Sequence, residues 1–257
     1  MCRLAAYLGP ELILKNLLEE DPHSLLKQSW ACNELQGTSL NADGFGFGWY
    51  QDDSAASYTS TMPIWSDANL PDLQRSLSSD LWLAYVRSAT AGQATNQANT
   101  QPFRHERYLF LHNGRIDNFN DGPRSTLHAY LPAEIASGIE GNTDSEYLFA
   151  MCRHHLASGM SPAQTIIAAC QELEVLEIKE PALLNIILSD GESLFACRHA
   201  INGAACPTLY FTDNHPHFPK ASVIASEIFS LPEYWQAVEE NTVLIINRAA
   251  APESIRL

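Results

Sequence analysis

The second residue of the chain, Cys2, would carry both a thiol and a free α-amine once the initiator Met1 is removed. An unperturbed thiol has a pKa of roughly 8.5 and an α-amine one of roughly 7.7 to 8.0, so about a tenth of such amines are neutral at pH 7 and able to accept the thiol proton. A lysine amine, at roughly 10.4, would need a large pKa shift to do the same. A single residue at this position therefore supplies a nucleophile together with its general base.

Two further segments end an apolar, strand-like run with polar groups. The segment 86–90 (VRSAT) sets Arg87 and Thr90 three residues apart, which suits bidentate recognition of a carboxylate. The segment 110–114 (FLHNG) ends in Asn113 and Gly114, and a side-chain amide beside a backbone N–H supplies the parts of an oxyanion hole. Each pattern also has a purely structural interpretation, namely a surface arginine at a strand end and an Asn-Gly hairpin turn.

Two more segments complete the set. The segment 142–146 (NTDSE) places Asp144 in the first turn of a predicted helix, where it can pair with an ammonium group or only offset the helix dipole. The segment 41–50 (NADGFGFGWY) has glycines at 44, 46 and 48, so in an extended strand one face would carry no side chains at these positions and another backbone could come near it. A turn followed by a Gly-rich strand would explain the same pattern without a ligand. Together, the segments fit a substrate with an α-amino acid head and an acyl tail.

Strands and helices must bring these segments together. Apolar runs predict strands at 2–8, 44–50, 81–88, 107–112, 183–188, 193–196, 208–211, 223–225 and 242–246. Helical spacing predicts helices at 11–18, at 70–77, from Thr143 with a capping box to Glu146, and from Pro162. Two groups of strands with helices between them indicate an α+β fold, in which two sheets stack face to face with helices outside, in one domain of residues 2–257.

Composition excludes several kinds of partner. The 257 residues are 46% hydrophobic, which is enough for a buried core, and 30 acidic against 15 basic residues give a net charge of −15. This charge argues against nucleic acid or an anionic membrane as partner. The apolar stretch 4–14 is interrupted at 9–11 and has no cleavage pattern, so we expect neither a signal peptide nor a membrane span, and a cytoplasmic protein.

The cysteines and histidines do not predict a metal centre. The six cysteines include no C-x-x-C pair, and no cysteine or histidine cluster has the spacing of a zinc site. We therefore expect no metal and no cofactor.

The ordered motifs resemble the class II glutamine amidotransferases of the N-terminal nucleophile (Ntn) hydrolase superfamily. The matching motifs are 1–3 (MCR), 41–44 (NADG), 87–90 (RSAT), 112–114 (HNG) and 143–146 (TDSE). The chain is also similar to the stand-alone γ-glutamyl amide hydrolases of ergothioneine biosynthesis in segments 23–26 (HSLL), 100–103 (TQPF) and 226–227 (SE). The resemblance runs from residue 2 to about residue 247.

The resemblance implies a four-layer αββα sandwich and a class II amidotransferase-type domain. The roles that it implies are a nucleophile at Cys2, an oxyanion hole at Asn113 and Gly114, binding of the substrate α-carboxylate by Arg87 with Thr90, and binding of the α-amine by Asp144. It implies an amide hydrolase without a cofactor that cleaves a small-molecule γ-glutamyl substrate through a thioester. Ala91 stands where glutamine-dependent synthases often have His, which argues against free glutamine as the substrate.

Three functions are compatible with these residues. The first is a γ-glutamyl amide hydrolase that acts alone on a γ-glutamyl conjugate of a sulfur metabolite, as in ergothioneine synthesis. The second is a glutaminase subunit, in a complex with a partner enzyme or as a homo-oligomer, that releases ammonia for a separate partner. The third is a non-catalytic binding module on the same fold. In the first two, we expect segments 45–50 and 100–103 to border the opening for the γ-substituent.

The proposed base requires that Met1 be removed, because an acylated nitrogen cannot accept a proton. We expect intact-mass analysis of active protein to find the chain without Met1. Full activity from a homogeneous preparation that retains Met1 would exclude the α-amine as the base.

Overall fold

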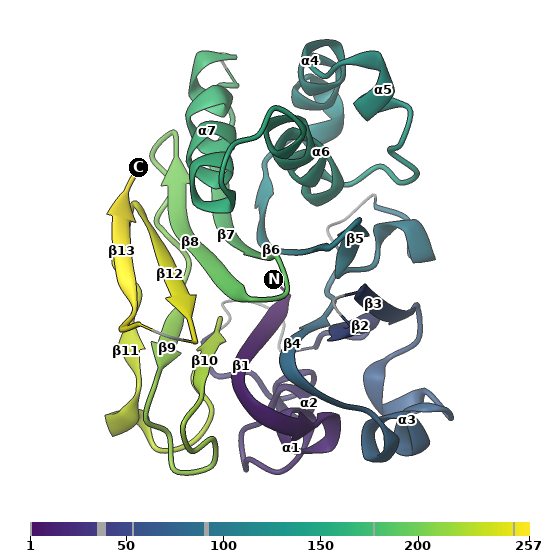
Figure 1. The fold of residues 1–257 in the computed structure, drawn as a ribbon. Helices are drawn as coiled ribbons and strands as arrows, with labels where there is room; N and C mark the ends of the chain where they lie inside the picture. The colour runs from purple at the N-terminus through teal and green to yellow at the C-terminus, as the bar shows by residue number, and fades with distance from the viewer. Residues whose placement is uncertain (1, 35–39, 53, 90–92, 177, 249) are drawn as a thin grey trace.

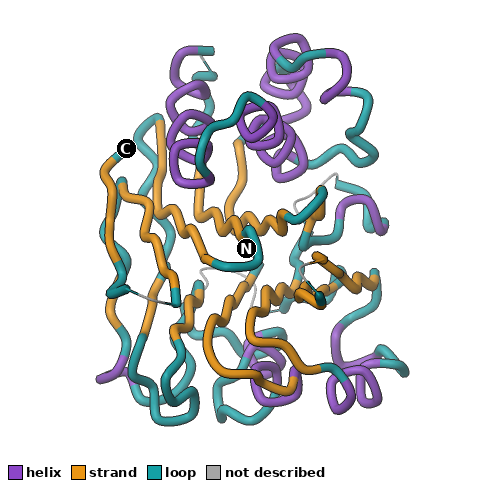
Figure 2. The backbone as a smooth tube through the Cα atoms, in the orientation of Figure 1, coloured by secondary structure: helices purple, strands orange, loops and turns teal. Residues whose placement is uncertain are grey.

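The computed structural model describes residues 2–34, 40–52, 54–89, 93–176, 178–248 and 250–257. Two antiparallel sheets lie face to face, and helices cover the outer face of each (Figures 1 and 2). This is the αββα sandwich expected from the sequence. The N-terminal end of the chain lies between the two sheets, where the first strand begins (Figure 1).

The first sheet has seven strands within the described residues, in the order β11-β9-β10-β1-β4-β2-β3. Its strands are β1 (Arg3–Ile13), β2 (Phe45–Gln51), β3 (Ser54–Ser60), β4 (Ser78–Val86), β9 (Tyr210–Thr212), β10 (Ser222–Ala225) and β11 (Gln236–Ala237). The helices that follow β1 and precede β4 are α1 (Leu14–Leu18), α2 (Leu25–Gln28) and α3 (Leu70–Ser76). They cover the outer face of this sheet (Figure 1).

The second sheet has six strands within the described residues, in the order β13-β12-β8-β7-β6-β5. Its strands are β5 (Phe103–His105), β6 (Tyr108–Ile116), β7 (Ala182–Ser189), β8 (Ser193–Ile201), β12 (Thr242–Asn247) and β13 (Glu253–Arg256). Its helices are α4 (Pro123–Tyr130), α5 (Ala133–Ala136), α6 (Asp144–Ala157) and α7 (Pro162–Val175). Short 3₁₀ turns occur at η1 (Ile64–Ser66), η2 (Gln97–Asn99), η3 (Phe119–Asp121) and η4 (Pro232–Tyr234).

Three apolar cores separate the four layers, and strand β1 contributes to two of them. Leu4 and Ala6 point into the core between the sheets, together with Cys2, whereas Ala5 and Tyr7 point into the core under α1 and α2. Because side chains alternate along a strand, β1 is buried on both faces. This explains why its sequence is almost uniformly apolar.

The structure corrects several sequence predictions. The helix predicted at 11–18 begins only at Leu14, because β1 continues to Ile13 across an irregularity between Leu8 and Leu12 that accommodates Gly9 and Pro10. The capping box at Thr143 is half formed: Thr143 Oγ1 accepts the Glu146 N–H, but the Glu146 carboxylate binds two earlier backbone N–H groups. Elements absent from the prediction are β3, β5, β11, β13, α2, α4 and α5.

The glycines of β2 allow the second sheet to approach closely, as their spacing predicts. A Cβ on Gly46 would lie 2.3 Å from the carbonyl oxygen of Gln101, and one on Gly48 would lie 2.9 Å from the Leu109 side chain. A methyl group at either position would overlap atoms of the opposite layer. No helix within the described ranges is long and apolar enough to cross a membrane.

The close approach at Gly46 generates a stability prediction. Gly46→Ala should lower the free energy of unfolding by about 1 to 3 kcal/mol, because the added methyl group meets a backbone carbonyl that cannot move aside like a side chain. Ser57→Ala, on the neighbouring strand opposite Gly48, adds no volume and serves as the control. Denaturant unfolding of both variants measures the difference, and a Gly46→Ala protein as stable as the parent would contradict this packing.

Candidate active site

Cys2 lies where β1 begins, at the end of the neighbouring strand β4. Its Sγ accepts the Ser88 N–H at 3.3 Å and its thiol donates to the Ser88 carbonyl oxygen, also at 3.3 Å. Only 9% of the residue is exposed. The thiol is therefore held by backbone groups on the wall of a cavity rather than on an open surface.

That cavity has a volume of about 290 Å³ and a largely polar lining. Its lining residues are Cys2, Tyr85, Arg87, Ser88, Ala89, Gln93, Asn99, Gln101, Gly114, Arg115, Thr143, Asp144 and Ser145. Five of the six predicted site residues lie at this place: four line the cavity, and Asn113 binds the Cys2 backbone. The sixth, Thr90, and the neighbouring Ala91 lie outside the described residues, as does Met1.

Arg87 follows β4 and is almost completely buried, with 3% exposed. Among the residues that the structure describes, its guanidinium donates to two backbone carbonyl oxygens, that of Asp43 at 3.4 Å and that of Ala94 at 3.2 Å. Within the described residues no carboxylate lies at ion-pair distance from it. The Asp43 side chain accepts the Ala89 N–H instead, at 2.8 Å. A buried cation without a counter-ion is costly, so this site favours an anionic ligand.

Asp144 is the complementary charged group in the lining of the same cavity. It opens α6, is 4% exposed, and its two oxygens accept the N–H groups of Ile116 at 2.7 Å and Ser145 at 2.9 Å. No lysine or arginine in the described part of the chain pairs with it. These two backbone bonds fix the carboxylate between the end of β6 and the start of α6, where it can accept hydrogen bonds from an ammonium group.

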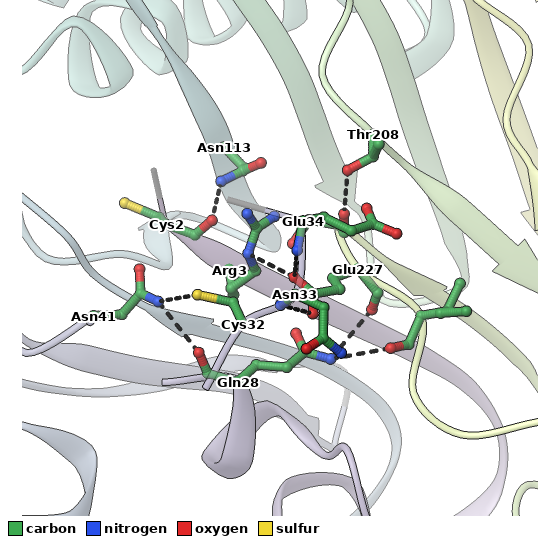
Figure 3. A network of polar contacts seen from close by, with 12 residues as sticks. Cys2, Arg3, Gln28, Cys32, Asn33, Glu34, Asn41, Asn113, Thr208 and Glu227 are labelled. Carbon is green, nitrogen blue, oxygen red and sulfur yellow. Dashed lines mark hydrogen bonds and ion pairs between the residues drawn. The ribbon is translucent and has the colours of Figure 1, made fainter. Parts of the chain in front are cut away.

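Asn113 connects the second sheet to the nucleophile. Its Nδ2 donates to the backbone carbonyl oxygen of Cys2 at 2.5 Å, and its Oδ1 is buried without a partner among the described residues (Figure 3). Asn113 and Gly114 pair with Asn185 and Leu184 inside the strand pair β6–β7, so the alternative of an Asn-Gly hairpin turn is wrong. A Cβ on Gly114 would lie 1.8 Å from the Leu183 carbonyl oxygen, so only glycine fits there.

A neutral hydrogen-bonded layer lies behind these groups. Burial lowers the pKa of His112, although the nearby Asp144 charge opposes this, so the imidazole is neutral at pH 7. Its Nε2 lies 2.9 Å from the Leu183 carbonyl oxygen, which only accepts, so Nδ1 must accept the Ser145 hydroxyl proton at 2.8 Å. The backbone N–H of His112 donates to Gln101 Oε1 at 2.5 Å.

No role was predicted for Tyr85 or Ser145, and Gln101 was predicted only to border the opening for the γ-substituent, although all three line the cavity. Each of these residues lies in a segment that the sequence patterns had singled out for other reasons, namely 81–88, 100–103 and 142–146. The expectation for segment 45–50 is wrong: none of its residues lines the cavity, because Phe45 and Phe47 are buried in the core under the helices. Of segment 100–103, Gln101 alone lines it.

A buried ion pair lies next to the nucleophile in the chain, at Arg3. Arg3 Nε lies 3.4 Å from Glu227 Oε2, and both side chains are nearly inaccessible (Figure 3). Glu227 Oε1 also accepts the Asn33 N–H at 2.7 Å and lies 2.6 Å from His23 Nε2. Burial alone would raise the pKa of Glu227, but the hydrogen bonds from His23 and the backbone, with the charge of Arg3, together lower it.

One group of potential metal ligands occurs among the described residues: Asp21, His215 and His217, whose ligand atoms lie within 4.8 Å of one another. These side chains form hydrogen bonds with one another and with Ser230. His215 Nδ1 accepts the His217 N–H, so its Nε2 donates to the Ser230 carbonyl oxygen, and Asp21 accepts from Ser230 and His217. The group is arranged as a hydrogen-bonded network that joins two loops.

Comparisons with known proteins agree with this geometry. Residues 21–224 match the family model of the class II glutamine amidotransferases. A γ-glutamyl-hercynylcysteine sulfoxide hydrolase from Mycolicibacterium smegmatis is 29% identical over 250 residues, which cover 97% of each chain. A hydrolase of the same name from Mycobacterium tuberculosis is 30% identical over 196 residues, 76% of each chain.

A solved structure shows the same fold. The glutamine aminotransferase class-II domain protein from Silicibacter pomeroyi superposes with a TM-score of 0.73 and 23% sequence identity, over 99% of each chain. The chain therefore belongs to the class II glutamine amidotransferases, with the fold of the Ntn hydrolases, and is an amide-hydrolysing enzyme. The family and the fold expected from the sequence are confirmed.

The ion pair beside Cys2 generates a pH-dependent prediction. Glu227→Gln leaves Arg3 buried without a counter-ion and should cost about 3 to 5 kcal/mol of stability at pH 7. Because the pKa of Glu227 is lowered on folding, this stabilisation is complete above the unfolded value of about 4.3 and is lost as the pH falls through the lower, folded value. Denaturant unfolding from pH 7 to pH 3 should show the parent and variant converging in acid.

The control is Glu192→Gln, because Glu192 is 80% exposed and pairs with the surface residue Arg107. It should change stability by less than about 1 kcal/mol at any pH in this range. Equal stability of Glu227→Gln and the parent at pH 7 would show that the buried pair does not stabilise the fold.

Proposed function

We propose that this enzyme is an N-terminal cysteine amidohydrolase that cleaves a γ-glutamyl amide bond through a thioester at Cys2, and that residues 2–257 form its one catalytic domain. One observation carries the proposal. Within the part of the chain that the structure describes, a single cavity holds a thiol, a buried guanidinium without a carboxylate partner and a buried carboxylate without a cationic partner. The two charges are complementary to the zwitterionic head of an amino acid, and the thiol is available to its acyl tail.

The amino acid head of the substrate would bind by supplying the counter-ions that the two buried charges lack. The substrate α-carboxylate would neutralise Arg87, aided by the Thr90 hydroxyl that the sequence motif supplies, and the α-ammonium would donate to Asp144. Charge-assisted hydrogen bonds of this kind are worth roughly twice those between neutral groups. Because Asp144 and Arg87 are each fixed by backbone contacts, little side-chain freedom would be lost on binding.

The reaction follows from the groups around the thiol. The free α-amine of Cys2 would take the thiol proton, and the thiolate would attack the γ-carbonyl carbon of the substrate. The oxyanion would be bound by the Gly114 N–H and by Asn113 Nδ2, which has two N–H groups and gives only one of them to the Cys2 carbonyl oxygen. The protonated α-amine of Cys2 would then give its proton to the leaving amine. Water would hydrolyse the thioester, which releases glutamate and restores the thiol.

The γ-substituent is the finer part of the proposal. Two relatives are named for hydrolysis of γ-glutamyl-hercynylcysteine sulfoxide, and the chain has Ala91 where glutamine-dependent synthases often have His. Both observations favour a γ-glutamyl conjugate of a sulfur metabolite, in ergothioneine or related synthesis, over free glutamine. An ammonia-donating glutaminase that works with a separate partner, and a non-catalytic binding module, remain the outcomes against which the proposal is tested.

The decisive experiment compares substrates. Purified protein without Met1 should hydrolyse at least one γ-glutamyl amide, including conjugates that carry a thioether or a sulfoxide, with a higher kcat/KM than glutamine. During turnover, mass spectrometry should detect Cys2 with one glutamyl group attached. Cys2→Ala is the matched control and should bind the substrate without cleaving it. A preference for glutamine, or activity only with a partner protein, favours the glutaminase subunit; no hydrolysis of any conjugate favours the binding module.

The role of Arg87 has its own test. Arg87→Lys should lower kcat/KM for substrates with a free α-carboxylate by about 10- to 100-fold, because an ammonium point charge cannot reproduce the guanidinium fork. Arg115→Lys is a matched control: Arg115 lines the same cavity but is exposed and pairs with Asp117. If Arg87→Lys and Arg115→Lys have the kinetics of the parent, Arg87 serves the structure and not the substrate.

A further inference from the structure

Tyr85 is buried beside the nucleophile and has no place in the reaction described above. It lies in β4 directly opposite Leu4 of β1, and its side chain shares the core between the sheets with Leu4 and Cys2. Cys2 is two residues before Leu4 on the same face, so Tyr85 and Cys2 are diagonal cross-strand neighbours, a separation that an aromatic side chain spans. Both residues line the same cavity.

Hydrogen bonds fix the direction of the Tyr85 hydroxyl. Gln101 Oε1 accepts the His112 N–H at 2.5 Å, so the amide orientation is set and Nε2 must be the group that faces Tyr85. Gln101 Nε2 donates to the Tyr85 hydroxyl oxygen at 3.1 Å and to the His112 carbonyl oxygen at 3.0 Å. The Tyr85 oxygen is therefore an acceptor from Gln101, and its own proton points elsewhere.

The remaining neighbour of this hydroxyl is Cys2. Among the described residues, no oxygen or nitrogen atom accepts the Tyr85 proton, whereas the Cys2 thiol lies beside it in the cavity. As a thiol, Cys2 donates to the Ser88 carbonyl oxygen. As a thiolate, Cys2 can only accept hydrogen bonds, so it keeps the bond from the Ser88 N–H and loses the one to the Ser88 carbonyl oxygen. A second hydrogen-bond donor would therefore stabilise the thiolate.

We propose that the Tyr85 hydroxyl donates a hydrogen bond to the Cys2 thiolate and is a further catalytic residue, with Gln101 as its positioning residue. The inference rests on the proposed role of Cys2 as nucleophile. The proton balance is unchanged: the thiol proton moves to the α-amine of Cys2, and Tyr85 keeps its own proton throughout. When the sulfur attacks the acyl carbon, its negative charge moves to the oxyanion and the bond from Tyr85 weakens.

The surroundings keep Tyr85 in the form that donates. Burial, and then the neighbouring Cys2, raise the pKa of Tyr85 well above its ordinary value, against the opposing charge of Arg87, and Asp144 raises it further. The charged and titratable side chains that line the cavity with Cys2 are Tyr85 from β4, Arg87 directly after it, Arg115 from β6 and Asp144 from α6, besides the amine of Cys2 itself. Tyr85 is the one among them that offers a neutral O–H donor.

Alkylation of the substrate-free enzyme tests this. The rate of reaction of Cys2 with iodoacetamide is measured from pH 5 to pH 9 by peptide mass spectrometry, with the partly exposed Cys32 and Cys206 as internal references. In Tyr85→Phe, the pH of half-maximal Cys2 alkylation should rise by about one unit, which makes alkylation near pH 7 about tenfold slower, and kcat/KM should fall by a similar factor. The references should not change.

Tyr50→Phe is the matched control, because it removes another largely buried hydroxyl between the sheets, one that donates to Ser189 and does not line the cavity. It should leave the Cys2 profile unchanged. If Tyr85→Phe folds poorly, 3-fluorotyrosine at position 85 keeps the ring and the hydroxyl but is a more acidic donor, and should shift the profile to lower pH.

An unchanged Cys2 profile in Tyr85→Phe or in the fluorotyrosine protein overturns the proposal. A variant with a raised KM and an unchanged alkylation profile also overturns it, because Tyr85 would then contact the substrate instead of the sulfur. The assay needs no substrate, so failure of the parent to hydrolyse any γ-glutamyl compound would refute the proposed function while the alkylation profiles still decide the role of Tyr85.

Discussion

The bond from Asn113 Nδ2 to the Cys2 carbonyl oxygen joins the two sheets at the point where the chemistry is proposed to occur. Cys2 begins a strand of the first sheet and Asn113 lies in a strand of the second, so their separation is set by how closely the sheets pack. Nearby, Gly46 of the first sheet meets the Gln101 backbone and Gly48 meets the Leu109 side chain of the second sheet, where an added Cβ would overlap their atoms. Interiors are close-packed, so these contacts transmit any shift in sheet spacing to the site.

Charge is distributed unevenly around this junction. Beside Cys2, Arg3 and Glu227 neutralise each other, and Glu227 accepts further hydrogen bonds. In the cavity, Arg87 and Asp144 are buried and held by backbone groups, and neither forms an ion pair with another described residue. A paired buried charge contributes to a defined structure, whereas unpaired ones reduce stability unless a ligand completes them. This difference is consistent with a site in which a zwitterionic substrate would form the two ion pairs that the folded protein itself leaves unformed.

Neutral groups hold the charged ones in position. His112 bridges the Leu183 carbonyl oxygen and the Ser145 hydroxyl, and its backbone N–H orients the Gln101 amide. Each member has a defined donor and acceptor role, so a change at one position would alter the direction of the others. Such a network constrains the cavity wall without adding charge to a site whose electrostatics depend on two isolated ions.

The sequence by itself determined the family, the candidate site residues and much of the secondary structure. Residues such as Cys2 and Asp144 were identified from local patterns, because a thiol next to an α-amine and a carboxylate in a first helical turn are properties of a few adjacent residues. Strands β4, β6 and β7 and helices α6 and α7 follow from periodicity in the same way.

Only the tertiary structure decided what those local patterns could not. The sequence left Asn113–Gly114 open between a hairpin turn and a strand, because the pairing partner, β7, lies about 70 residues away along the chain. It gave no sign that Gln101 donates to Tyr85, that Glu227 pairs with Arg3, or that Phe45 and Phe47 pack under the helices and away from the cavity. The physical reason is the same in each case: these contacts join segments that are distant in sequence, and burial and hydrogen-bond partners exist only once the two sheets have packed together.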